Sequence, residues 1–225
     1  MGTISYKDTS APAAEPVTLD QAKAQCVVDT GFTDDDTLIT SLIVAARQYV
    51  EKLTQRAIFN RTVQLNLDFF PFPDFSPTLN PNDRHCLYGH WWHQLAIKLP
   101  RPSCVSVTSI TYLDLTATEQ TVSDSLYYVD LNSEPARIVP MPGLYWPYTQ
   151  SYLPGSVQVN FTAGTYGDGV EVNNCPQTIC QAMLLLISYW YNHRDSAESN
   201  PPKAIEHGVA ALLAGEVFDT FGLIA

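Results

Sequence analysis

The clearest periodic pattern in the chain lies between residues 34 and 56. Apolar side chains recur there three or four positions apart, which is the spacing of one face of an α-helix. These positions are Leu38, Ile39, Leu42, Ile43, Ala46, Tyr49, Val50 and Leu53. Thr33 stands at the expected N-cap, and three aspartates follow where the helix dipole favours carboxylates. The pattern predicts an amphipathic helix whose outward polar face carries Arg47 and Glu51.

Three more segments have helical patterns. Thr18 and Gln21 have the spacing of a capping box and predict a helix over about 18–27. The segment 176–193 begins with a proline and is apolar nearly all round, so it must be buried on every side, in a core or between subunits. Cys180 in this segment is expected to be buried and inert. A short helix over about 208–214 is expected to end the helical part.

The middle of the chain changes to a period of two, which is typical of half-buried strands. Strands are predicted near 62–69, 95–99, 105–112, 119–122, 127–131, 137–139 and 157–161. The alternation shifts phase across Thr108 and Ser109, which indicates a β-bulge. Short strands separated by turn residues predict an antiparallel barrel or small sandwich.

The predicted fold class is therefore α+β, with a helical scaffold built from both chain ends and an inserted antiparallel β module. The expected parts are a flexible N-terminal arm over 1–16, a helical connector domain over 17–60 and 165–215, an inserted β domain over 61–164 with long loops at 70–93 and 140–155, and a C-terminal tail over 216–225.

Charge and composition narrow the possible partners. The net charge is −11, so the chain lacks the cationic surface that grips duplex DNA, although an acidic surface suits DNA that slides past without sticking. The 5 cysteines form no CxxC pair, which favours a reducing compartment over a disulfide framework. There is no signal-like start and no apolar run long enough to span a bilayer, so we expect a soluble intracellular product with no membrane partner.

The sharpest metal candidate is the cluster of His85, Cys86, His90 and His93, whose side chains are all zinc ligands. Its spacing matches no standard zinc module, and solvated or hydrogen-bonded histidines in an interaction loop explain it better. No metal or cofactor is therefore assigned. The glycine-rich segment 164–169 lacks the spacing of a phosphate-binding loop and is expected to be a strand-to-helix turn.

No catalytic constellation is visible, because the chain has no GxSxG elbow and its carboxylates stand beside turns. We therefore predict that the protein is not an enzyme. The two long loops are instead rich in large aromatic side chains, which are typical binding anchors. Two interpretations stay open: the aromatics form interfaces, or they fold back to cover the β module. The residues concerned are Trp91, Trp92, Tyr145, Trp146 and Tyr148.

Several segments, taken in order and spacing, resemble one family. They are Pro16-Val-Thr-Leu-Asp-Gln-Ala-Lys23, Val28-Asp29, Asp34-Asp-Asp-x-Leu-Ile, Ala45-Ala-Arg-x-Tyr-Val-Glu51, Leu99-Pro-Arg-Pro102, Val105-x-Val-x-Ser-Ile-x-Tyr112, Phe161-Thr-Ala-Gly164, Tyr166-Gly-Asp168 and Pro176-x-x-Ile-x-Gln-Ala-x-Leu-Leu-Leu186. Together they resemble the head–tail connector (adaptor, or head-completion) proteins of tailed bacteriophages, the gp6-like or phiE125 gp8-type family. The loops 70–93 and 140–155 have no counterpart motif.

The resemblance implies a structural virion protein at the head–tail interface, made in the host cytoplasm. Such adaptors form a homo-oligomeric ring, commonly a dodecamer, beneath the portal protein. The ring extends the channel through which genomic dsDNA passes and docks the stopper or tail. The resemblance assigns 34–53 and 179–191 to the ring body and 208–225 to a portal-binding tail. The interface candidates are Arg47, Glu51, Trp91, Trp92, Tyr145, Trp146, Tyr148, Trp190, Leu212, Leu213, Phe218 and Phe221.

Two alternatives stay open from the sequence. One is a stopper or tail-completion protein, one layer further from the head. The other belongs to a different class, a metal-dependent hydrolase that uses the loop from His85 to His93.

Overall fold

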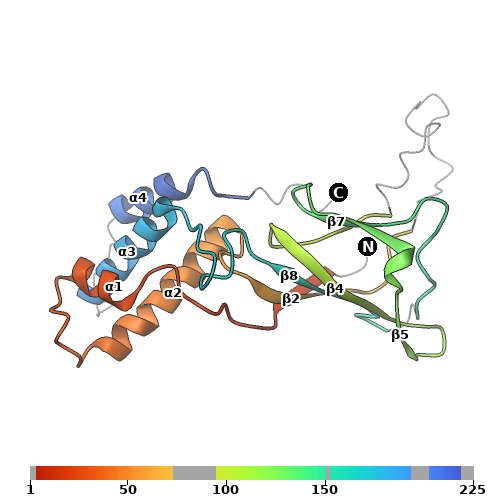
Figure 1. Ribbon diagram of the computed structural model, residues 1–225, viewed down its shortest axis with the longest axis horizontal. Helices are drawn as coiled ribbons and strands as arrows, with labels where there is room; N and C mark the ends of the chain where they lie inside the picture. Colours follow the sequence, from red (N-terminus) through yellow and green to blue (C-terminus); the bar gives the residue numbers. More distant parts are fainter. Residues whose placement is uncertain (1–3, 73–94, 151–152, 194–202, 219–225) are drawn as a thin grey trace. The chain divides into compact units, whose positions relative to one another are not determined.

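The computed structural model describes residues 4–72, 95–150, 153–193 and 203–218 (Figure 1). These residues belong to two compact units. The β unit holds the described residues of 4–11 and 61–163, and the helical unit holds those of 12–60 and 164–218. Each unit is thus assembled from segments far apart in the sequence.

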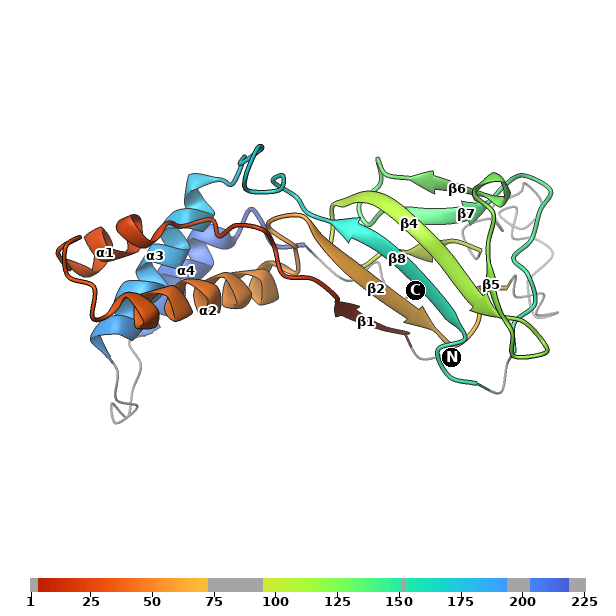
Figure 2. The same cartoon turned by 60° about the horizontal axis from the view of Figure 1, so that its bottom comes forward.

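The β unit contains two antiparallel sheets. The larger has the strand order β1-β2-β8-β4-β5 and the smaller has β3-β7-β6 (Figure 2). The strands are β1 (Ile4–Asp8), β2 (Arg61–Leu67), β3 (Ile97–Lys98), β4 (Cys104–Leu113), β5 (Glu119–Thr121), β6 (Tyr127–Asp130), β7 (Arg137–Pro140) and β8 (Val157–Ala163), with a 3-10 turn η2 (Asp124–Leu126) before β6. The described strands form a sandwich-like module and do not close into a barrel, so of the two predicted forms the sandwich is the one found.

The core of the β unit follows from the alternation in its central strands. Val63 and Leu65 of β2 are fully buried, and Gln64 between them is only partly covered. Leu65 lies opposite Val159 of β8, which in turn lies opposite Ile110 of β4, so one face of three strands supplies the apolar layer. The register of β4 shifts between Val107 and Ser109, which confirms the predicted bulge.

The first residues differ from the expected flexible arm over 1–16. Residues 4–8 form β1, which runs antiparallel to β2 and pairs Ile4 with Leu67 and Asp8 with Val63. All five side chains of β1 are exposed, so the segment has no buried face to reveal its strand character in the sequence. Its order comes from backbone pairing with the open edge of β2, which is a tertiary contact.

The described residues of the helical unit contain four helices. They are α1 (Leu19–Cys26), α2 (Asp36–Thr54), α3 (Gln177–Asn192) and α4 (Lys203–Leu213). The predicted capping box of α1 is present, with the Thr18 hydroxyl accepting from the Gln21 N–H and the Gln21 side chain accepting from the Thr18 N–H. Helix α4 begins several residues before the predicted 208, directly after the proline pair at 201–202.

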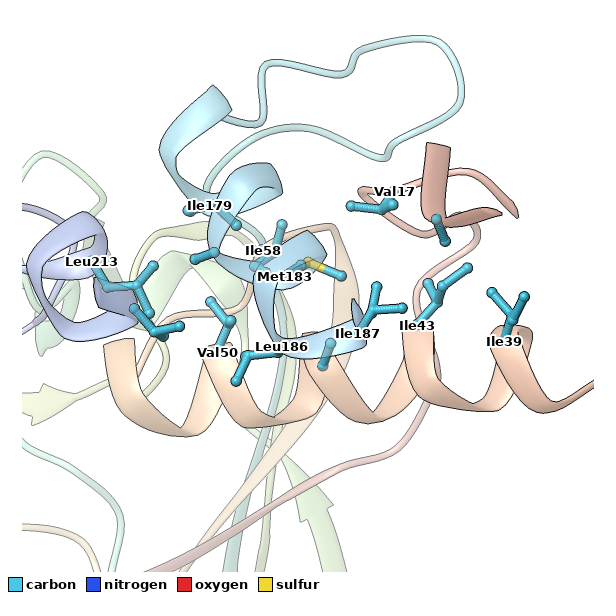
Figure 3. Close-up of a cluster of buried hydrophobic side chains, with 14 of the residues drawn as sticks. Val17, Ile39, Ile43, Val50, Ile58, Ile179, Met183, Leu186, Ile187 and Leu213 are labelled. Atoms are coloured by element: carbon cyan, nitrogen blue, oxygen red, sulfur yellow. The ribbon is translucent and has the colours of Figure 1, made fainter. Parts of the chain in front are cut away.

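Helix α3 is the centre of the helical unit and packs against α1, α2 and α4. Figure 3 shows Ile43 and Val50 of α2 pointing towards Leu186 and Ile187 of α3. Five apolar side chains of α3 are buried: Ile179, Ala182, Met183, Leu186 and Ile187. The described helices of one chain therefore bury one side of α3, whereas Leu184, Leu185 and Trp190 are only partly buried. The predicted burial of this helix on every side is thus not complete within one chain.

The start of α2 differs from the predicted Thr33 cap. The helix begins at Asp36, and its N-cap, Asp35, makes no side-chain capping bond. The Asp35 carboxylate instead accepts a hydrogen bond from the Tyr191 hydroxyl at 2.5 Å, and the Asp36 carboxylate pairs with the Lys23 ammonium at 2.5 Å. The aspartates thus tie α2 to α3 and α1, and long-range partners replace the local cap.

The glycine-rich segment after β8 is the predicted turn. The Asp168 carboxylate accepts the backbone N–H groups of Val170, Glu171 and Val172, which closes a tight loop and lowers the pKa of Asp168. Gly167 has a φ of +95° within this loop, a conformation that L side chains rarely adopt.

Replacing Gly167 with alanine is expected to lower the free energy of unfolding by about 2 kcal/mol or more. A Cβ at this position would lie 2.1 Å from the Val172 carbonyl oxygen, and the backbone already has a positive φ. Urea unfolding followed by circular dichroism measures the change. The matched control is Gly208→Ala in α4 of the same unit, where nothing lies within 4 Å of the added methyl. That control is expected to stabilise the helix, by up to about 1 kcal/mol, and equal losses in both variants would contradict the prediction.

Candidate assembly interface

A patch of apolar side chains remains exposed on the helical unit. Tyr49 and Leu53 of α2 are 37% and 40% exposed, and Trp190 of α3 is partly buried beside Tyr49. The Tyr49 and Trp190 rings meet edge to face, with centroids 6.0 Å apart and planes at 89°. We refer to Tyr49, Leu53 and Trp190 as the helical patch.

The helical patch follows from how α2 lies on α3. The buried positions Ile43, Ala46 and Val50 face the core, while Tyr49 and Leu53, one turn apart, lie at the border of the same apolar stripe. The sequence placed Tyr49 and Leu53 with the core face and therefore missed them as surface candidates. The sequence signal for an exposed edge was the width of the apolar stripe of α2, which one partner helix could not cover. Only the packing of the helices decides which edge of this stripe stays exposed.

Arg47 and Glu51 are not on an outer polar face, which corrects the sequence-based expectation. They are 4% and 2% exposed. Arg47 donates from Nε to Glu15 at 2.8 Å and from Nη1 to Glu51 at 3.0 Å, and the second Glu51 oxygen accepts the Ile58 N–H at 3.1 Å. The pair is an internal link between α2, the segment before α1 and the segment after α2. Neither side chain offers a surface for a second protein.

Trp146 follows one of the two interpretations of the loop over 140–155, in which aromatic side chains cover the β module. Its indole N–H donates to the Leu95 carbonyl at 2.7 Å, and its ring stacks on Phe70 with centroids 4.9 Å apart. Only 4% of Trp146 is exposed. This tryptophan therefore folds back and covers the sandwich-like module, which is a structural role.

The neighbouring tyrosines of the same loop are exposed, in contrast to Trp146. Tyr145 and Tyr148 are 58% and 75% exposed. Tyr148 stacks on Phe72, itself partly exposed, with ring centroids 6.1 Å apart. We refer to Phe72, Tyr145 and Tyr148 as the aromatic patch. The loop is thus anchored by one aromatic side chain and presents others to the surroundings.

The C-terminal interface candidates also differ in how far they are buried. Leu213 is buried at the end of α4, and Leu212 is partly buried. Phe218 donates its N–H to the Thr54 carbonyl at 2.9 Å, and the Arg56 guanidinium lies 5.8 Å from the centre of its ring. The described part of the predicted tail is therefore folded onto the end of α2.

Comparison with known proteins gives a match only at the level of structure. No protein-family profile matches the sequence, and no curated protein matches it. A chain in the neck of an empty gene transfer agent (GTA) particle, computed with C6 symmetry, has a TM-score of 0.69 and 21% identity, and the alignment covers 97% of this chain and 98% of that one. This chain has the fold of a gene transfer agent neck chain.

Two further structures agree. A chain from the virion of a native gene transfer agent particle gives a TM-score of 0.67 at 20% identity, over 96% of this chain and 97% of that chain. A chain from the neck of the native particle, computed with C12 symmetry, gives 0.62 at 19% identity, over 97% and 98%. The likeness to these chains therefore extends over both units of this protein.

Some sequence-predicted residues lie outside the described part of the chain. These are His85, Cys86, His90, Trp91, Trp92, His93 and Phe221. Within the described residues, no three histidine, cysteine or acidic side chains gather as a metal site would require. No helix in the described ranges combines the length and apolar content needed to cross a bilayer.

Proposed function

We propose that this protein is a head–tail adaptor, a structural virion protein that forms a homo-oligomeric ring beneath the portal. The ring extends the DNA channel, and its far side docks the stopper or tail. It does so without a cofactor and without catalysing a reaction.

The observation that carries the proposal is the likeness in fold to neck chains over nearly the whole length of both partners. Two of those structures were computed with C6 and C12 symmetry, which fits a ring of repeated copies. The motif order from Pro16 to Leu186 independently resembles the connector family of tailed phages. These two lines of support do not depend on each other.

The helical patch supplies a contact for a neighbouring copy in the ring. Its three side chains are large and apolar, and two are aromatic, the types that contribute most to binding when a partner excludes water from them. Helices α2 and α3, which carry the patch, are the segments that the resemblance assigns to the ring body. In a closed ring with rotational symmetry, the same contact is repeated between every two neighbouring copies.

The remaining surfaces suit the other partners. The aromatic patch of the β unit offers exposed tyrosines to a stopper or tail protein. A net charge of −11 per chain repels the phosphate backbone, so genomic dsDNA can pass without being held. Passage in this form needs no sequence-specific contact.

The test is to mix the purified chain with rings of the portal protein from the same genome and image the product by cryo-electron microscopy. We expect a ring of chains, twelve for a twelve-fold portal, coaxial with the portal and in direct contact with it. Native mass spectrometry of the same sample gives the copy number. Binding only to a preformed adaptor ring would instead identify a stopper or tail-completion protein and would overturn the adaptor proposal.

Leu53→Glu is expected to reduce the fraction of portal rings carrying this protein by tenfold or more, because it places a carboxylate in an apolar contact. The matched control is Thr40→Glu, which adds the same charge at an exposed position on another face of α2. Circular dichroism checks that both variants keep the native fold. Equal occupancy by the two folded variants would rule out the helical patch as the ring contact.

A further inference from the structure

Two thiols lie side by side where the turn after β8 enters α3. Cys175 and Cys180 are five residues apart, and their sulfur atoms are 3.8 Å apart. Both side chains are partly exposed, unlike the buried thiols of Cys26 and Cys104. The expectation that Cys180 is buried is therefore wrong. No sequence signal pointed to this pair, because its spacing is not that of a CxxC motif.

The pKa values of the two thiols shift in opposite directions. The hydrogen bond between the two thiols lowers the pKa of Cys180 below the ordinary thiol value, and the same bond, together with burial, raises the pKa of Cys175. Burial raises the pKa of Cys26, and it raises that of Cys104 to about 11. Among the described cysteines, Cys180 is therefore the one that ionises first, and the thiolate is the reactive form of cysteine.

We propose that Cys175 and Cys180 form an oxidisable dithiol site, which reacts with small disulfides such as oxidised glutathione to give an intramolecular disulfide. The attacking atom is the Cys180 sulfur, and Cys175 is the resolving thiol. This proposal does not depend on the adaptor function, because it rests only on the geometry of the helical unit.

The reaction balances in two exchange steps. The Cys180 thiolate attacks one sulfur of glutathione disulfide, breaks its S–S bond, forms a mixed disulfide and releases one glutathione thiolate. Cys175 then loses its proton and attacks the Cys180 sulfur, which forms the Cys175–Cys180 bond and releases the second glutathione. Two protein thiols are oxidised, one disulfide is reduced, and the two protons end on the two released glutathiones.

The disulfide would link Cys175, just before α3, to Cys180 in the first turn of that helix. The sulfurs must approach from 3.8 Å to about 2.0 Å, a change within reach of side-chain rotation. The preceding segment is already held by the Asn174 N–H donating to the Tyr166 carbonyl, and the Cys180 sulfur lies 3.7 Å from the Pro16 carbonyl oxygen. The crosslink would therefore form inside an ordered part of the unit.

The test uses the full-length native protein with glutathione disulfide at neutral pH, followed by quenching in iodoacetamide and tryptic digestion. The peptide that follows Arg137 and ends at Arg194 contains Cys175 and Cys180 and no other cysteine. We expect this peptide to lose two hydrogens and to resist alkylation, at a rate at least tenfold above the modification of Cys26 and Cys104. Reduction with dithiothreitol should restore both alkylation sites.

Two variants separate the roles. Cys175→Ser should stop at the mixed disulfide, with one glutathione on Cys180, and Cys180→Ser should leave Cys175 unmodified. Cys104→Ser in the β unit is the control and should form the disulfide at the wild-type rate. If the native peptide stays fully alkylated, or if the oxidised product links two chains, the proposal is overturned.

Discussion

Replacing Ile187 with aspartate is expected to abolish folding of the helical unit. Ile187 is fully buried in α3, among the side chains that α2 and α3 share (Figure 3). Truncating such a side chain to alanine alone removes about 2–5 kcal/mol, and an unpaired carboxylate in the same place adds several more. The sum is comparable to the total stability of a typical domain, about 5–15 kcal/mol. Far-UV circular dichroism should show loss of helix and of a cooperative transition.

A graded series separates burial from a general effect on α3. Ile187→Val removes one methylene and should lower the free energy of unfolding by only about 1 kcal/mol. Gln181→Asp adds the same charge as Ile187→Asp at an exposed position of the same helix and should change stability by less than about 0.5 kcal/mol. A folded, cooperative Ile187→Asp protein would mean that α3 is not the centre of this unit.

The second large effect is expected at the buried ion pair of Arg47 and Glu51. Glu51→Ala should lower the free energy of unfolding by about 3–5 kcal/mol, because it leaves a buried guanidinium without its buried charge partner. It also removes the acceptor of the Ile58 N–H. Glu15, the other carboxylate on Arg47, has a 28% exposed side chain and compensates less well. Urea unfolding at neutral pH measures the loss.

A double-mutant cycle tests whether the pair acts as a unit. Arg47→Met with Glu51→Leu removes both charges and fills the space with apolar atoms, so it should lose clearly less stability than the sum of the losses in Arg47→Met alone and Glu51→Leu alone. Glu51→Gln is the isosteric control, since it keeps an oxygen for the Ile58 N–H and removes only the charge. Additive losses across the cycle would show that Arg47 and Glu51 do not depend on each other.

The sequence predicted the local elements well because their signals are local. The apolar spacing of α2, the capping box of α1 and the alternation of β2 and β8 each depend on residues a few positions apart. The bulge in β4 was visible as a change of phase. The order of these patterns along the chain predicted the α+β class, with a β module inserted in the sequence between helical segments.

The candidate interface could be predicted only in part. Large aromatics identified the loop 140–155 as an interface candidate, but nothing local distinguishes Trp146, which is buried against Phe70, from the exposed Tyr148. Arg47 and Glu51 looked like surface residues because charged side chains on a helix usually are. Their burial depends on Glu15 and Ile58, which approach α2 only in the folded unit.

The chain by itself thus determined most of the helices and strands, that no familiar catalytic or metal motif is present in standard spacing, and that the charge disfavours gripping DNA. The tertiary structure alone decided that residues 4–8 become a strand, which side of the α2 stripe stays exposed as the helical patch, and that Cys175 meets Cys180. The reason is common to all three: secondary structure is encoded in neighbours along the chain, whereas exposure and side-chain pairing depend on which distant segment covers a surface.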